Sequence, residues 1–193
     1  MCNGGIAITA ARHGQLECMQ VALNMGFIWC DALLTNAAAG GHLHILEWAE
    51  QAGMKMQVEQ LCLRAAAGGH LNTLVWLHSR GHTCDTWTVA LAAKAGHHAV
   101  VQWLVERRCP VNHWACALAA WGNHLSLLKW LRSKNCSWDG RVTAFARYHD
   151  YTEVLDWALG AGCPDDLGAY PAGVDAEHLG WLQVQHVPFF FSY

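Results

Sequence analysis

Hydrophobic residues recur along the chain at helical spacing and are interrupted by short polar stretches. Trp114, Leu118 and Trp121 are spaced four and three residues apart, the spacing of one helix face. The Gly-Asn pair at 122–123 follows, and both residues tolerate the left-handed conformation that ends a helix. A second apolar stripe then runs through residues 124–134 and ends in a polar stretch. The pattern predicts a short helix, a tight turn, a longer helix and a loop.

This pattern recurs with a period of about 27 residues. Five tryptophans follow one another at steps of 28, 27, 27 and 27 residues: Trp48, Trp76, Trp103, Trp130 and Trp157. Four histidines each stand six residues before a tryptophan: His42, His70, His97 and His124. The longer step predicts one extra residue in the loop near residues 54–59. Neither helix of a unit can bury its apolar face alone, so neighbouring units must stack to bury it.

The period predicts an all-α fold, a helix-turn-helix repeat solenoid of about six to seven stacked helix pairs with short loops. The chain then forms a single repeat domain, residues 1–193, whose predicted units are 4–30, 31–57, 58–85, 86–112, 113–139, 140–166 and a degenerate last unit at 167–193. We expect the tryptophan of each second helix to be a core residue wedged between units. We expect each histidine to bond turn backbone and to help cap the second helix.

Two stretches, AAAGGHLNTLVWLHSRG at 65–81 and LAAKAGHHAVVQWLVERRC at 91–109, resemble the ankyrin repeat. The resemblance covers essentially the whole chain and implies an ankyrin-like array that binds proteins on a concave face fed largely by the first helices. The units are shorter than the family's roughly 33 residues, which implies that the hairpin between units is trimmed to a short loop. The family's TPLH start is absent, and TWTVALAA stands in its place at 86–93. Short, Trp-bearing units are similar to ankyrin arrays of large DNA viruses of protists, which implies a host protein as the partner if the source is viral.

The positions just before each turn give the candidate partner-binding residues. These positions are small in the middle units and larger in the later ones, and aromatic and Arg side chains are enriched at interface hot spots. The candidates are Arg64, Lys94, Trp121, Arg147 and Tyr148. In the alternative interpretation, Trp121 only packs against the next unit.

Nine cysteines and thirteen histidines raise a second hypothesis, a metal-binding or enzymatic helical-repeat module. The sequence holds no CxxC or HExxH motif, no nucleophile elbow and no phosphate-binding loop. Cys109, Cys136 and Cys163 recur every 27 residues, and we expect them to be small buried residues with reduced thiols. We therefore predict a protein that is not an enzyme, with no catalytic residues, no metal ligands and no cofactor.

Charge and hydropathy narrow the range of partners. The chain has 12 Lys and Arg against 15 Asp and Glu, a net charge of −3, so it lacks the basic excess of a general nucleic-acid binder. No apolar run approaches the roughly 18 residues that span a bilayer, and no secretory signal is visible. We expect an intracellular, cytoplasmic monomer that binds a protein, not nucleic acid or a membrane. We expect the Phe-rich residues 187–193 to cap the array; contact with a partner or with a second copy of the chain is the alternative.

Overall fold

The computed structural model describes residues 5–26, 28–56, 58 and 60–165, and in this part of the chain every regular element is a helix. The helices in chain order are α1 (Gly5–Arg12), α2 (Leu16–Asn24), α3 (Asp31–Ala39), α4 (Leu43–Gln51), α5 (Leu61–Ala67), α6 (Leu71–Ser79), α7 (Thr86–Lys94), α8 (His98–Glu106), α9 (His113–Trp121), α10 (Leu125–Ser133), α11 (Arg141–Tyr148) and α12 (Thr152–Gly160). The predicted all-α array of helix pairs is confirmed.

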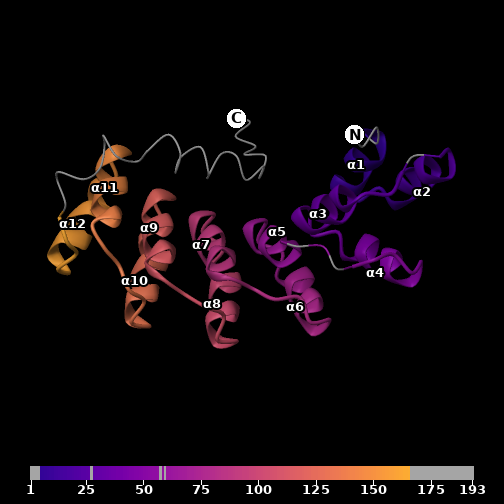
Figure 1. Ribbon diagram of the computed structural model, residues 1–193. Helices are drawn as coiled ribbons and strands as arrows, with labels where there is room; N and C mark the ends of the chain where they lie inside the picture. Colours follow the sequence, from indigo (N-terminus) through magenta and orange to yellow (C-terminus); the bar gives the residue numbers. More distant parts are fainter. Residues whose placement is uncertain (1–4, 27, 57, 59, 166–193) are drawn as a thin grey trace.

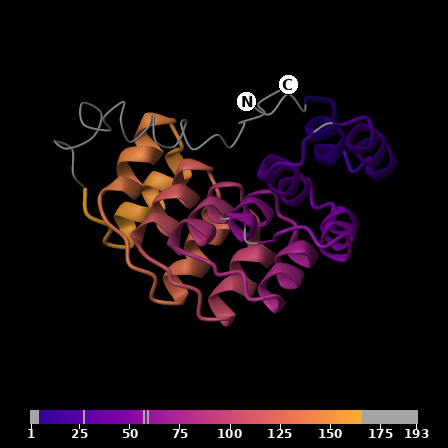
Figure 2. The same cartoon turned by 45° about the vertical axis from the view of Figure 1, so that its right-hand side comes forward.

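The helices form two curved rows (Figure 1). Odd-numbered helices stack side by side from α1 to α11 and line the concave side of the arc, whereas even-numbered helices lie on the convex side (Figures 1 and 2). Most contacts between neighbouring pairs run through the odd-numbered row. The odd-numbered helices are therefore called the inner helices and the even-numbered ones the outer helices.

Small residues explain why the inner helices can approach one another closely. Ala37, Ala65, Ala92 and Ala119, at equivalent places on four inner helices, are completely buried. The turn after each inner helix is tight because one residue there adopts the left-handed conformation. Glycine fills this place at Gly69, where φ is 77°, and asparagine does so at Asn123, where φ is 59°.

Each repeated histidine bonds backbone next to the turn of the preceding helix pair, whereas the expected help in capping the second helix was wrong. The Nε2 atom of His42 donates to the backbone oxygen of Arg12 at 2.7 Å, and His124 donates to that of Lys94 at 3.0 Å. His70 and His97 make the same bond to the oxygens of Ala39 and Ala67. None of the four side chains makes a cap hydrogen bond.

Glycine gives the histidine ring the room to cross between pairs. The ring of His97 lies directly against Gly69 in the turn of the preceding pair. A Cβ atom on that glycine would stand 2.6 Å from two ring atoms. One glycine therefore serves two purposes, because it adopts the left-handed turn conformation and also leaves the surface that receives the next histidine.

The repeated tryptophans are half-buried rim residues and not core residues, which corrects the expected row of wedged indoles. The fully buried positions of the outer helices are smaller, for example Leu74, Leu104 and Leu128. The indoles pack on this core from its edge and meet polar neighbours there: the ring of Trp103 lies 5.3 Å from that of His78, and the guanidinium of Arg80 lies 3.7 Å from the ring of Trp76. An indole is too large for the narrow space between stacked helices, which methyl and isobutyl groups fill.

The loop between α4 and α5, residues 52–60, is the longest between described helices, as the 28-residue step predicts. Each described pair lies inside one predicted unit, but the unit boundaries themselves stay a prediction. The degenerate unit at 167–193 and the Phe-rich residues 187–193 lie outside the described residues. No described helix is long and apolar enough to cross a membrane.

Candidate functional site

Three neighbouring inner helices carry a second apolar stripe on the face turned away from the outer helices. On α9 this stripe consists of Trp114, Ala117, Leu118 and Trp121, at positions i, i+3, i+4 and i+7. The opposite face of α9 packs into the main core through residues such as Cys116 and Ala120. The equivalent stripes are Trp87, Ala90, Leu91 and Lys94 on α7, and Arg141, Ala144, Phe145 and Tyr148 on α11.

These stripes join into an apolar cluster that is separate from the main core. Ala90, Ala117, Leu118 and Phe145 form its buried part, and each is at most 2% exposed. Trp87, Leu91, Trp114 and Trp121 pack on this cluster and are only partly buried. We call Trp87, Leu91, Trp114, Trp121 and Tyr148 together the inner aromatic surface.

Trp121 is the centre of ring contacts at one edge of this surface. Its ring meets the edge of Phe145 at 4.8 Å and stacks with Tyr148 at 6.2 Å, both on the next inner helix. The Lys94 ammonium lies 5.1 Å from the same ring, a cation–π distance. Tyr148 is 63% exposed, so this edge presents an aromatic ring to solvent. The alternative that Trp121 packs against the next unit is therefore correct as a contact, and the ring still keeps an accessible side.

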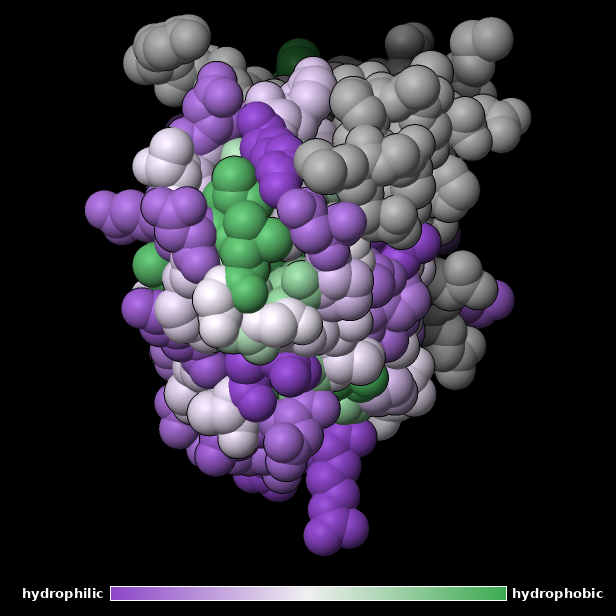
Figure 3. Space-filling view, turned by 90° about the vertical axis from the view of Figure 1, so that its left-hand side faces the viewer, coloured by the Kyte–Doolittle hydropathy of each residue, from purple (hydrophilic) through white to green (hydrophobic). Residues whose placement is uncertain are grey.

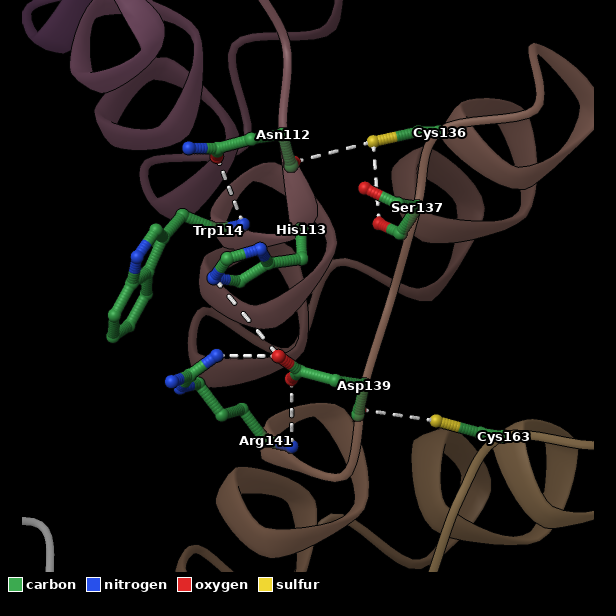
Figure 4. Close-up of polar contacts among 8 residues, drawn as sticks. All are labelled: Asn112, His113, Trp114, Cys136, Ser137, Asp139, Arg141 and Cys163. Carbon is green, nitrogen blue, oxygen red and sulfur yellow. Dashed lines mark hydrogen bonds and ion pairs between the residues drawn. The ribbon is translucent and has the colours of Figure 1, made fainter.

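Trp87 and Trp114 form the other edge, near the first turns of α7 and α9. Their rings lie 5.4 Å apart, and the guanidinium carbon of Arg141 lies 4.6 Å from the Trp114 ring centre. Asp139 pairs with Arg141 and so holds the guanidinium beside the indole (Figure 4). The side-chain oxygen of Asn112 accepts a hydrogen bond from the backbone N–H of Trp114 at 3.0 Å, which fixes the start of α9.

The loops behind this edge are held by cysteines. The Cys136 thiol donates to the backbone oxygen of Asn112 at 3.4 Å, and the Cys163 thiol donates to that of Asp139 at 3.3 Å (Figure 4). Burial raises the pKa of Cys163 to about 11 and that of Cys109 to about 12. Both thiols are therefore protonated at neutral pH and are poor nucleophiles and metal ligands. Within the described ranges, no group of three or more His, Cys, Asp and Glu side chains is placed to hold a metal ion.

Burial also changes the charge of the cationic side chains near the surface. It lowers the pKa of Lys94 to about 8, so the ammonium loses its proton in mildly alkaline solution. Burial, and to a smaller extent Lys94, lowers the pKa of His149, whose ring lies 4.7 Å from that of Trp121. His149 is therefore neutral at physiological pH.

The structure brings together three of the five candidate residues, Lys94, Trp121 and Tyr148. Arg147 is on the same helix as Tyr148, but it makes a two-oxygen ion pair with Asp165, at 2.8 and 2.7 Å. Arg64 is on α5, beyond the three helices that carry the apolar stripe, and burial lowers the pKa of its guanidinium.

Sequence reasoning missed Trp87, Leu91, Trp114 and Arg141. The signal was present, because Trp114, Leu118 and Trp121 have helical spacing, but one stripe alone does not tell which of two buried faces it forms. Helix α9 is apolar on both faces, and a helix that is apolar all round is normally covered on both sides.

No family model and no curated protein matches the chain. Among solved structures, the chain is similar to the human ASB11 ankyrin repeat domain, with a TM-score of 0.63 and 16% sequence identity over 81% of this chain and 83% of that one. The likeness, together with the helix pairs and turns described above, shows that this chain has the ankyrin-repeat fold.

Proposed function

We propose that this protein is a non-enzymatic, intracellular scaffold that binds a protein partner through the inner aromatic surface. Trp121 is its central contact, with Lys94 and Tyr148 against its ring, and Arg147 on the helix of Tyr148 is proposed as a neighbouring contact. The observation that carries the proposal is the second apolar stripe on α9, which the stacking of helix pairs does not require. Partly exposed aromatic side chains on a second apolar face of a repeat array are typical of a partner-binding face.

The chemistry of the surface fits a protein partner. Trp and Tyr are among the side chains most enriched at interface hot spots, and Tyr148 stacks on the ring of Trp121 with the Lys94 ammonium beside it. Helices α7 and α9 are fixed by contacts to inner helices on both sides, and α11 packs on α9 and α12, so docking orders little of the scaffold. Arg64 on α5, the inner helix before α7, lies on the same concave row and is proposed as a peripheral contact.

A comparative capture experiment tests the proposal. Full-length wild-type protein is used as bait in an extract of the source cell or, for a viral source, of its host. A second bait carries Trp121→Ala, Arg147→Ala and Tyr148→Ala. A matched control carries Val75→Ala, Arg107→Ala and Leu159→Ala, three exposed side chains on the outer row.

We expect the partner of the wild type to be reduced at least about tenfold on the first variant and retained on the control. Thermal unfolding of all three baits establishes that each is folded. If folded baits of both kinds capture the partner equally, the surface is not the binding site. If the control alone loses it, the outer helices bind the partner instead.

A further inference from the structure

The inner aromatic surface has a chemical counterpart in the same chain. We propose that the C-terminal residues 166–193 dock on the inner aromatic surface and, given the proposed function, compete there with the protein partner. The occupant is thus a tethered segment of this chain, and the surface is regulated by its release.

The surface needs an apolar cover of limited size. Leu118 and Ala117 are buried on the face of α9 that looks away from the outer helices, and the indoles of Trp87 and Trp114 border them while staying partly exposed. Exposed indoles in a continuous patch favour contact with further apolar groups. A few aromatic side chains are enough to cover an area that spans three neighbouring helices.

The composition of the C-terminal segment matches the surface. Residues 166–193 contain three acidic residues, Asp166, Asp175 and Glu177, and no Lys or Arg. Their aromatic residues are Tyr170, Trp181, Phe189, Phe190, Phe191 and Tyr193. The segment is therefore acidic and aromatic. The surface is aromatic, with the cation Lys94 at one edge and Arg141, paired with Asp139, at the other. The segment and the surface are therefore complementary in apolar character and, at the Lys94 edge, in charge.

The last described residues, Pro164 and Asp165, are held against α11, so the segment begins next to the inner aromatic surface. The backbone oxygen of Pro164 accepts a hydrogen bond from Thr143 at 3.0 Å, and Asp165 pairs with Arg147. Both partners are on α11, the helix that also carries Tyr148. A fully extended stretch from Asp165 to Phe189 reaches at most about 80 Å, whereas three stacked helices span only about 20 Å. A tether of this length gives a local concentration on the order of millimolar, so even weak contacts suffice.

The rival place for the segment is the end of the array beyond α12. This end shows a small apolar area surrounded by hydrophilic residues (Figure 3), and Leu159 there is 37% exposed. The exposed charges of α12 are Glu153 and Asp156, and the helix contains no Lys or Arg. These carboxylates repel an acidic segment, so charge favours the concave side over the end face.

Photo-crosslinking in the full chain tests the proposal. Phe190 is replaced by p-benzoylphenylalanine, and the cross-linked peptides are identified by mass spectrometry. We expect intramolecular products within 86–94, 113–121 or 141–149. Lys94→Glu should lower their yield by roughly threefold, because a cation near the rings becomes an anion, whereas Lys129→Glu on the outer helix α10 should not change it. Products confined to 152–165, products between two copies, or an unchanged yield with Lys94→Glu would overturn the proposal.

Capture then separates this inference from the proposed function. Changing Phe189, Phe190 and Phe191 to Ser should raise the amount of partner captured if both are correct. If cross-links form on the inner aromatic surface but the bait with Trp121→Ala captures as much partner as the wild type, the docked segment is supported and the proposed function is wrong. Cross-links elsewhere, combined with loss of capture by the Trp121 variant, would do the opposite.

Discussion

The inner helices of the first three pairs and those of the last three share one framework and present different surfaces. On α3 the stripe equivalent to that of α9 contains the partly buried Thr35 and Asn36, whose side chains donate to the backbone oxygen of Ala32 at 3.2 and 2.8 Å. The same stripe on α9 contains Leu118 and Trp121, which join an apolar cluster. Polar groups satisfied within their own helix need no cover, but the apolar stripe does.

The framework itself does not differ between the two regions. The histidine bond to the preceding pair is 2.9 Å at His70 and 3.0 Å at His124. The two regions differ in the side chains on the inner-helix face that is turned away from the outer helices. In this fold, the residues that build the array and the residues that define its surface are therefore largely separate sets.

The largest effect is expected from Leu118→Ala. Leu118 is completely buried in the apolar cluster, so its truncation should lower the free energy of unfolding by about 2–5 kcal/mol. An equivalent residue of the other region is Asn36, whose side chain bonds its own helix, and its change to Ala should cost less than about 1 kcal/mol. Urea unfolding of both variants measures the difference, and equal losses would mean that the two regions are not distinct in their packing.

Glycine variants test whether the framework is common to both regions. Gly69→Ala places a methyl group against the ring of His97 and should cost about 1–3 kcal/mol more than Gly53→Ala. Gly53 is the matched control, because its φ of 72° is close to the 77° of Gly69 but a methyl group added there would meet no other atom within 4 Å. Gly96→Ala, whose methyl group would meet His124, should cost as much as Gly69→Ala. A clear difference between the two costs would mean that the packing of the framework also differs between the two regions.

The smallest effect is expected at Lys94, which occupies the place that Arg12 holds in the first pair. Burial lowers the pKa of Lys94 to about 8, from 10.5 in an unfolded chain. Between these values the unfolded chain binds more protons than the folded one, so the free energy of unfolding should rise with pH there. Relative to Lys94→Met, the rise should be less than about 1 kcal/mol, because the group is partly exposed. Urea unfolding at pH 7 to 10 measures it, and a fall would contradict the lowered pKa.

The repeat made the fold predictable from the sequence, because equivalent residues recur in each pair and must have equivalent environments. The positions of the helices and turns followed from spacing around residues such as Gly122 and Trp130. Spacing did not reveal that the His42 ring crosses to the preceding pair, since that contact depends on the offset between stacked pairs.

The surface was predictable only in part. Lys94, Trp121 and Tyr148 were recognised from their positions before the turns, whereas Trp87 and Trp114 lie at the other end of the inner helices. These two rings lie 5.4 Å apart on neighbouring helices. The spacing of residues along a single helix does not reveal a contact of this kind.

The central claim is that the partner binds the later inner helices and not the earlier ones, and a titration of the captured partner tests it most directly. One variant carries Lys94→Glu and Tyr148→Ala, and its counterpart carries Arg12→Glu and Asn36→Ala at inner-helix positions of the first region. We predict that the dissociation constant rises at least about tenfold for the first variant and less than about twofold for the second. A larger rise for the Arg12 and Asn36 variant would contradict the account.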